Sequence, residues 1–401
     1  MTVLPTTTLD GRPLRVLLVS HHYPPHVGGI ENVVHQEAVR LAARGVEVTV
    51  LTSGGRTAVT VEDGGVRVVR IAAWNGAERR AGVPFPLLSP RLAPAALRWT
   101  RWADVVHVHD CQYLTSWAAG AAAALTGTRY LLTQHVSLVQ HPSALVIGVQ
   151  RAVYGSLGRL LLRRAGRVVT LNASVADFVR RYGARPERAL HLPNGVDTGL
   201  FRPAVSAGQR RAARERFGLP QDRPLVLFVG RLVPKKGFRL LLDAHAASAD
   251  PGYDLVFAGD GDTAALTGRP GVHHLGALVP AELAEVYPAC DVFALPSTAE
   301  GFPLTVQEAM AAGLPVVTTD DPGYAPYRLD RDHVLLLPRE AAVLAAALTE
   351  LAADADRRQR MARYSRARAE QDFGWDRHVE QLLRHYADAA PQPAPAPVGA
   401  G

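Results

Sequence analysis

Lysine, cysteine and long apolar runs are scarce in this sequence, and each scarcity excludes a class of protein. The only two cysteines, Cys111 and Cys290, lie far apart, which excludes a disulfide framework and a cysteine-based metal motif. No uninterrupted apolar run reaches the ~20 residues that span a bilayer. Of the 44 lysines and arginines only Lys235 and Lys236 are lysines, and they are adjacent. The use of lysine at these two positions, in a chain that otherwise uses arginine, indicates a site that needs a compact ammonium group. Chance is the alternative explanation, because only two residues are involved.

The N-terminus lacks a basic region followed by an apolar one, so we expect no signal peptide and a cytoplasmic protein. The 401 residues are 48% hydrophobic and 20% charged, which is typical of a soluble globular chain with two or three domains. The formal net charge of +7 suits a phosphorylated substrate or an anionic membrane. Aromatic and basic residues do not interleave, so nucleic acid is not expected as a partner.

The most informative stretch is 293–318, FALPSTAEGFPLTVQEAMAAGLPVVT. Two apolar runs predict strands on either side of a helix over 304–312, with Pro303 at its first position and Gly313 as its C-terminal cap. Glu300 precedes this helix, and Glu308 lies about a turn and a half inside it. Both glutamates can therefore face the crevice at the carboxyl ends of parallel strands, where open α/β sheets bind ligands. A helix with two solvated glutamates is the plainer alternative.

The N-terminal half alternates strands and helices in the same way. A strand over 15–20 is followed by Gly28 and Gly29 and then by a helix over 31–43. Glycines between a strand and a helix N-terminus allow close approach of a phosphate, although a bare Gly-Gly is weak evidence. Further strands are expected over 46–51 and 66–71.

Two later strands end in histidines. The strand over 104–110 ends in His107, His109 and Asp110, and the strand from Tyr130 ends in His135. The H-x-H-D pattern resembles metal ligands, but we favour polar groups that line a cleft at the strand ends.

In the second half, a strand over 225–230 runs directly into Arg231-Leu-Val-Pro-Lys-Lys-Gly237. Two cations fixed after a strand could stabilise negative charge on a ligand, and a basic surface turn is the alternative. A Pro-Asn-Gly-Val-Asp turn at 193–197 and a Gly-Asp-Gly turn at 259–261 complete the motifs.

Together these motifs resemble the retaining GT-B glycosyltransferases of family 4, which transfer sugars from nucleotide diphosphate donors. The resemblance runs from Gly28 to the last helix and implies an α/β protein with two Rossmann-like domains facing across a cleft. It implies that Arg231 and Lys236 clamp the diphosphate, that Glu308 holds the ribose, and that Glu300 and His135 act at the donor sugar. No metal and no cofactor is implied beyond the sugar nucleotide itself. The implied catalytic residues are His135, Glu300, Arg231 and Lys236, and the implied donor-binding residues are Gly28, Gly29, Arg231, Lys236, Glu300, Gly301, Phe302, Pro303, Leu304 and Glu308.

The resemblance also sets the expected organisation of the chain. The expected parts are a disordered N-terminus (1–13), an acceptor-binding domain (14–199), a linker (200–222), a nucleotide-sugar-binding domain (223–374), a helix crossing back onto the N-terminal domain (375–389) and a disordered tail (390–401). Two features depart from the family pattern: Lys235 stands where many relatives have an acidic residue, and the loop 320–328 differs. The second departure puts sugar and acceptor contacts in doubt.

We therefore predict a retaining, metal-independent hexosyltransferase whose acceptor is a glycolipid, a polyprenyl-linked sugar or a soluble sugar. A non-catalytic sugar-nucleotide-binding subunit, a GT-B phosphorylase and a GT-B epimerase are the alternatives. The apolar–basic segment 148–167 fits a helix on an anionic membrane surface as well as it fits a core helix with a solvated face. The protein is accordingly expected in the cytoplasm, either free or peripheral on the inner face of the cell membrane.

Overall fold

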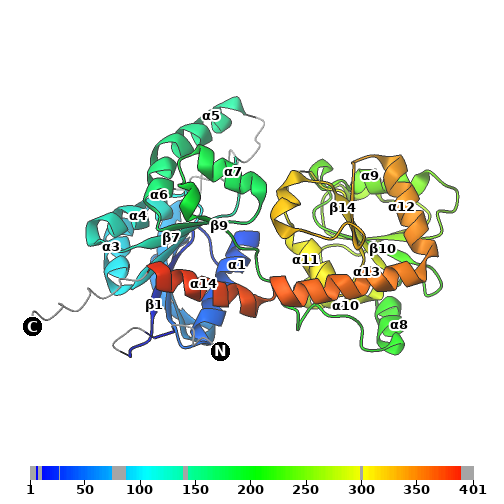
Figure 1. Ribbon diagram of the computed structural model, residues 1–401, viewed down its shortest axis with the longest axis horizontal. Coiled ribbons are helices and arrows are strands. Elements are labelled where there is room, and N and C mark those ends of the chain that lie inside the picture. The colour runs from blue at the N-terminus through cyan, green and yellow to red at the C-terminus, as the bar shows by residue number, and fades with distance from the viewer. Residues whose placement is uncertain are drawn as a thin grey trace, which may run out of the picture. The chain divides into compact units, whose positions relative to one another are not determined.

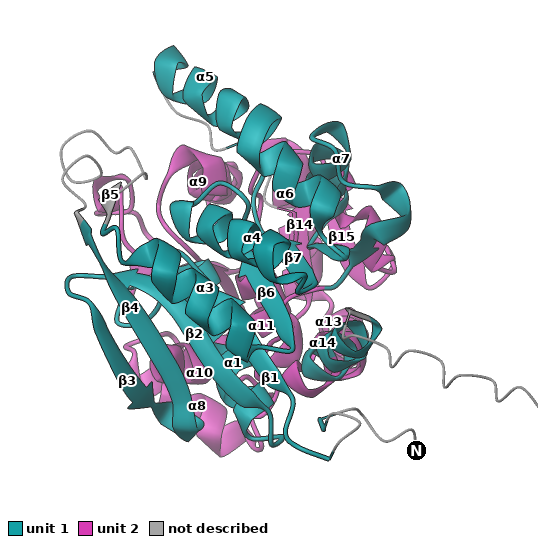
Figure 2. Cartoon of the chain, turned by 90° about the vertical axis from the view of Figure 1, so that its left-hand side faces the viewer, with its two compact units in different colours: residues 1–192, 378–401 teal, residues 193–377 magenta. Residues whose placement is uncertain are grey.

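The computed structural model describes residues 6–7, 11–26, 28–74, 87–138, 143–298 and 301–389. The chain forms two compact units, and each is an α/β structure around a mainly parallel sheet (Figures 1 and 2). Unit 1 contains residues 1–192 and 378–401, and unit 2 contains residues 193–377.

Unit 1 has a nine-stranded sheet in the order β3-β4-β2-β1-β6-β7-β8-β9, with β5 paired to β4. All pairs are parallel except β3–β4 and β4–β5. The order reverses between β1 and β6, so the crevice at their carboxyl ends is a topological switch point. The strands are β1 (Arg15–Val19), β2 (Glu47–Gly54), β3 (Ala58–Glu62), β4 (Val66–Trp74), β5 (Leu87–Leu88), β6 (Val105–His109), β7 (Tyr130–Gln134), β8 (Arg167–Thr170) and β9 (Ala189–His191).

Helices cover both faces of this sheet because its central strands are apolar on both sides. On β1, Leu17 and Val19 face one core cluster, and Val16 and Leu18 face the other. The first cluster includes residues of α3, α4, α6 and α7, and the second includes residues of α1 and α14. The helices are α1 (Gly29–Ala42), α3 (Leu92–Trp102), α4 (Leu114–Thr126), α5 (Ala144–Val153), α6 (Arg159–Arg164), α7 (Ala173–Arg181) and α14 (Trp375–Ala389), the last of which enters unit 1 at His378.

Unit 2 has a six-stranded parallel sheet in the order β12-β11-β10-β13-β14-β15, with its switch point between β10 and β13. One core cluster joins this sheet to the helices around it. The strands are β10 (Leu225–Val229), β11 (Asp254–Ala258), β12 (Val272–His274), β13 (Val292–Leu295), β14 (Val316–Thr319) and β15 (Val334–Leu337). The helices are α8 (Ala207–Arg216), α9 (Phe238–Ala246), α10 (Pro280–Ala289), α11 (Leu304–Ala311), α12 (Ala341–Ala353) and α13 (Ala355–Arg368).

The structure differs from the sequence-based expectations in its boundaries. The units divide at residues 192 and 193, ahead of the expected linker (200–222), which belongs to unit 2 and includes α8. Pro303 is the N-cap of α11 and not its first helical residue. Strand β3 was not expected. The expected disordered tail (390–401) and most of the expected disordered N-terminus (1–13) lie outside the described residues.

The apolar–basic segment forms a nearly continuous helical run over α5, a π-helical turn (Tyr154–Gly158) and α6. Among the described residues, this run, Ala144–Arg164, is long and apolar enough to cross a membrane, judged by length and composition alone. The buried core helix of a soluble protein can meet the same criteria.

Candidate functional site

The candidate donor site is at the switch point of the sheet in unit 2. Strands β10 and β13 are parallel neighbours, with Val226 opposite Val292 and Leu227 opposite Phe293. Their carboxyl ends therefore bring together the loop that contains Arg231 and Lys236 and the loop that follows Leu295. Open α/β sheets bind ligands at such a position.

Contacts between backbones hold these two loops together. The Thr298 N–H donates to the Lys235 carbonyl at 2.9 Å, and the Thr298 hydroxyl contacts the same oxygen at 3.3 Å. Gly237 has a φ of 76°, and a Cβ at this position would lie 2.1 Å from the Pro296 carbonyl oxygen. Only glycine permits both this conformation and this approach.

The Gly-Asp-Gly turn after β11 supports the cationic loop from its other side. A Cβ on Gly259, whose φ is 144°, would lie 2.1 Å from the Gly230 carbonyl oxygen. Leu232 pairs with Gly261 in a parallel bridge. The predicted motif at 259–261 is thus a packing element under the loop that carries the cations.

The two predicted cations differ in exposure. Arg231 is exposed, whereas Lys236 is half-buried and ends a short 3-10 helix, Pro234–Lys236. The Lys236 side chain passes Gly230, and a Cβ on that glycine would lie 3.7 Å from Cδ and Cε of the lysine. The stem of Lys236 is therefore held by packing at the strand end, while Arg231 stands in solvent.

Glu300 lies outside the described residues, so its predicted place at the site is not part of the structure. The residues that follow it are described: Gly301 is buried with a φ of 67°, and Leu304 begins α11 after the N-cap Pro303. The Phe302 ring is buried and packs on Tyr327, with ring centroids 4.0 Å apart.

Phe302 thereby connects this loop to the segment that departs from the family pattern. Tyr324 and Tyr327 both come from the 3-10 helix Pro322–Tyr327, within the atypical loop 320–328, and both contact the Phe302 ring. The atypical loop is thus packed into unit 2 beside the candidate site.

Glu308 projects from α11 and has one partner that the sequence did not suggest. The hydroxyl of Tyr287, on α10, donates to Glu308 Oε2 at 2.8 Å. Burial raises the pKa of Glu308 from 4.5 to about 7, despite this hydrogen bond to its charged form. Burial therefore favours the protonated form of this carboxyl, and the hydrogen bond from Tyr287 orients it.

In unit 1, the predicted glycines lie at the N-terminus of α1 after β1. Gly29 is open, because a Cβ there would have nothing within 4 Å. Gly28 is not: a Cβ there would lie 2.2 Å from Glu31 Oε2, and His26 Nδ1 lies 2.9 Å from Glu31 Oε1. The helix N-terminus already has a carboxylate of its own beside Gly28, which would compete with a bound anion for that end of the helix.

His135 follows β7 at the same edge of the sheet and is 8% exposed. Its backbone N–H donates to Asp110 Oδ1 at 2.9 Å, and its Nε2 lies 3.0 Å from His109 Nδ1. Burial lowers the pKa of His135 to about 3, so the imidazole is neutral at physiological pH. Asp110 itself has a φ of 59° and turns out of the line of β6.

The expectation that His107 and His109 line a cleft at the strand end is wrong. Their side chains are buried in the interior of unit 1. His107 lies between the Thr133 hydroxyl at 2.7 Å and the Tyr386 hydroxyl at 2.8 Å. Helix α14, which supplies Tyr386, could not be placed beside this strand from sequence spacing.

The predicted residues thus gather at two sheet edges. Those at the edge of unit 2 are Arg231, Lys236, Gly301, Phe302, Pro303, Leu304 and Glu308. Those at the edge of unit 1 are Gly28, Gly29 and His135. Tyr287 and Thr298 are site-forming residues that the sequence alone did not identify.

Nearly the whole chain is similar to known proteins. Residues 28–195 match the family described as Glycosyl transferase 4-like domain, and residues 209–368 match the family described as Glycosyl transferases group 1. A D-inositol 3-phosphate glycosyltransferase of Xylanimonas cellulosilytica is 32% identical over 94% of this chain and 97% of its own. A protein of the same name from Nocardia farcinica is 32% identical over 98% of this chain and 94% of its own.

Solved structures share the fold. Sucrose-phosphate synthase from Thermosynechococcus elongatus superposes with a TM-score of 0.71 at 23% identity, covering 93% of this chain and 98% of its own. Anabaena HepE in complex with UDP gives a TM-score of 0.72 at 20% identity, covering 93% of this chain and 100% of its own.

Replacing Gly237 tests the close approach between the two loops of unit 2. Gly237→Ala should lower the free energy of unfolding by about 2 kcal/mol or more beyond the cost of a control, because its Cβ meets a backbone oxygen. Gly252→Ala is the control, since its φ of 78° is similar and nothing lies within 4 Å of its Cβ. Urea denaturation measures both, and equal losses would contradict the packing role of Gly237.

Replacing Glu308 tests its raised pKa. A carboxyl whose pKa is raised on folding stabilises the protein at low pH and loses that contribution as the pH rises towards about 7. The side chain of Glu308→Gln stays neutral. The free energy of unfolding of this variant, relative to that of wild type, should therefore rise by about 1–3 kcal/mol between pH 5 and pH 8. Denaturation at both pH values measures this, with the exposed Glu285→Gln as control. A stability difference that does not change with pH would refute the raised pKa.

Proposed function

Because the chain belongs to the family 4 GT-B glycosyltransferases, we propose that it transfers a hexosyl unit from a nucleotide diphosphate sugar to a hydroxyl group with retention of configuration. The observation that carries this proposal is the cationic loop at the switch point of unit 2. There Arg231 and Lys236 lie at the same sheet edge as Glu308, and backbone contacts fix the loop.

Arg231 and Lys236 neutralise the charge that develops on the leaving nucleoside diphosphate. Fixed cations at that position stabilise the transition state more than the ground state, which is what accelerates the reaction. Lys235, beside them, adds positive charge to the same loop. With these cations in place the transfer requires no added divalent metal.

Glu308 holds the ribose hydroxyls of the donor. Its carboxylate accepts their hydrogen bonds from an orientation fixed by Tyr287. Glu300 contacts the donor sugar from the loop before α11, whose N-terminus faces the diphosphate. These roles follow from the family resemblance, and they agree with the position of α11 after β13.

His135 assists at the sugar as a neutral hydrogen-bond donor from unit 1. Burial holds its pKa at about 3, so it does not act by carrying a positive charge. No residue at the site is assigned as a nucleophile. As in the mechanism proposed for the family, substitution takes place on one face of the sugar, and a phosphate oxygen of the donor accepts the proton of the acceptor hydroxyl.

For the co-substrates, the relatives and neighbours suggest where to begin. The similar proteins of X. cellulosilytica and N. farcinica are named for D-inositol 3-phosphate, so a phosphorylated polyol is the first acceptor to test. HepE binds UDP in its structure, so a UDP-sugar is the first donor to test. Glycolipid and polyprenyl-linked acceptors remain within the proposal.

The helical run Ala144–Arg164 docks the cytoplasmic protein on the inner face of the membrane. Its exposed apolar side chains, Leu145, Val149, Leu157 and Leu160, lie among arginines such as Arg151 and Arg159. Apolar side chains beside arginines are the composition of a helix that lies in an anionic interface.

The transferase proposal predicts a large effect at Lys236 and a small one at its neighbour. Lys236→Ala should lower kcat/KM by about 100-fold or more, as loss of a transition-state cation does. Lys235→Ala, a matched control on the same turn, should lower it less than about fivefold. Release of the nucleoside diphosphate, followed with chelator present, measures the rate. Proton NMR of the new glycosidic linkage identifies the anomer formed. An inverted product, or strict dependence on added Mg²⁺ or Mn²⁺, would contradict the proposal.

The membrane proposal predicts salt-sensitive binding. The protein should pellet with phosphatidylglycerol vesicles at low salt and much less with phosphatidylcholine vesicles. Leu157→Glu with Leu160→Glu should abolish pelleting, whereas Leu125→Glu, at a site 79% exposed on α4, should not. Equal behaviour of the two variants, or no pelleting of wild type, would exclude this surface.

A further inference from the structure

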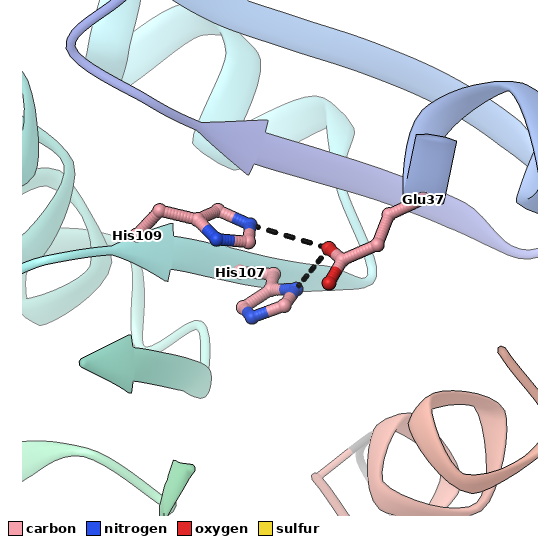
Figure 3. Close-up of side chains that lie close together, drawn as sticks. All are labelled: Glu37, His107 and His109. Atoms are coloured by element: carbon pink, nitrogen blue, oxygen red, sulfur yellow. Dashed lines mark ion pairs between the residues drawn. The ribbon is translucent and has the colours of Figure 1, made fainter. Parts of the chain in front are cut away.

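A compact group of metal-ligand side chains lies inside unit 1, away from its surface. Glu37 projects from α1 towards β6, and His107 and His109 project from β6 towards the same carboxylate (Figure 3). Glu37 Oε2 lies 3.4 Å from His109 Nε2 and 3.7 Å from His107 Nδ1. All three potential ligand atoms lie within 4.8 Å of one another.

Burial makes this group unusual. Glu37, His107 and His109 are 1%, 0% and 1% exposed. Glu37 Oε2 and His109 Nε2 have no hydrogen-bond partner among the described residues, although both point into the group. Every ion-pair partner of Glu37 in the described part of the chain is a histidine. A carboxylate that is buried in its charged form is stable only with a cation beside it.

Each of the three side chains is also held from behind by another group. His107 Nε2 contacts the Thr133 hydroxyl at 2.7 Å, and His109 Nδ1 contacts His135 Nε2 at 3.0 Å. The second oxygen of the carboxylate, Glu37 Oε1, contacts His378 Nε2 at 2.9 Å. Protein metal sites use such outer contacts to orient their ligands and to fix histidine tautomers.

We propose that Glu37 Oε2, His107 Nδ1 and His109 Nε2 bind one divalent cation, with Zn²⁺ as the best match. Histidine and carboxylate are usual zinc ligands, and tetrahedral zinc separates neighbouring ligand atoms by about 3.4 Å. Two of the three separations, from Glu37 Oε2 to His109 Nε2 and to His107 Nδ1, are 3.4 and 3.7 Å and are close to that value. The two histidine nitrogens lie within 4.8 Å of each other. The Tyr386 hydroxyl, 2.8 Å from His107 Nδ1, gives up that hydrogen bond when the nitrogen binds zinc and is a candidate for the fourth ligand.

The enclosed position makes this a structural site and not a catalytic one. It joins α1 to β6, and through His378 and Tyr386 it also fastens α14 to the sheet. With zinc on His109 Nε2, the ring proton lies on Nδ1 and is donated to His135 Nε2. The ion thus positions His135, the proposed donor at the sugar, without touching substrate.

Metal content of the purified full-length chain tests the proposal independently of any transfer activity. After dialysis against excess zinc and then metal-free buffer, wild type should retain about one zinc ion per chain by mass spectrometry. Glu37→Gln should bind zinc about tenfold more weakly or worse. Glu47→Gln, an exposed partner of Arg15, is the matched control and should retain the ion.

Thermal unfolding and cobalt spectra keep the test decisive if Glu37→Gln fails to fold. Zinc should raise the Tm of chelator-treated wild type, and Co²⁺ in the same protein should give the visible absorption of a tetrahedral site. His109→Asn should lose both responses. Wild type with less than about a tenth of an equivalent of zinc and no Tm response would overturn the proposal. If folded Glu37→Gln retained as much zinc as wild type, the proposal would also be overturned. The cation beside Glu37 in wild type would then be a histidine imidazolium.

Discussion

The candidate donor site depends on close backbone contact between two loops at the carboxyl ends of β10 and β13. Gly237 approaches the Pro296 carbonyl where no side chain fits, and Thr298 donates to the Lys235 carbonyl. On the other side of the cationic loop, Gly259 approaches Gly230 equally closely. Ordering long cationic side chains around a ligand costs conformational entropy. Because the backbone of this loop is already fixed, binding the diphosphate does not have to order the loop as well.

Much of unit 2 could be predicted because its signals are local. The apolar runs of β13 and β14, with Pro303 and Gly313 between them, specify a strand, a helix and a strand within one short stretch. The cationic loop follows directly from a continuous apolar strand, β10. Buried parallel strands appear in a sequence as continuous apolar runs. The carboxyl ends of neighbouring parallel strands lie at the same edge of the sheet, so Arg231 and Glu308 were expected at that edge.

What the sequence did not predict involves partners that are distant in the chain. The Tyr287 hydroxyl meets Glu308 across 21 positions, and His378 meets Glu37 across 341. Spacing on one strand correctly placed His107 and His109 on one face, but it could not show that α1 and α14 would cover that face. His107 and His109 on β6 are therefore interior groups.

The most direct test of the donor site is a calorimetric titration of UDP, GDP and ADP into the wild type, Arg231→Ala and Glu308→Ala, with chelator present. We expect that one diphosphate binds wild type with a Kd of about a micromolar and that either substitution weakens it by about tenfold or more. Glu285→Ala, an exposed carboxylate on α10, should leave binding unchanged. If no diphosphate binds the folded wild type, or if the two site variants bind as well as it does, the donor site assigned to unit 2 is wrong.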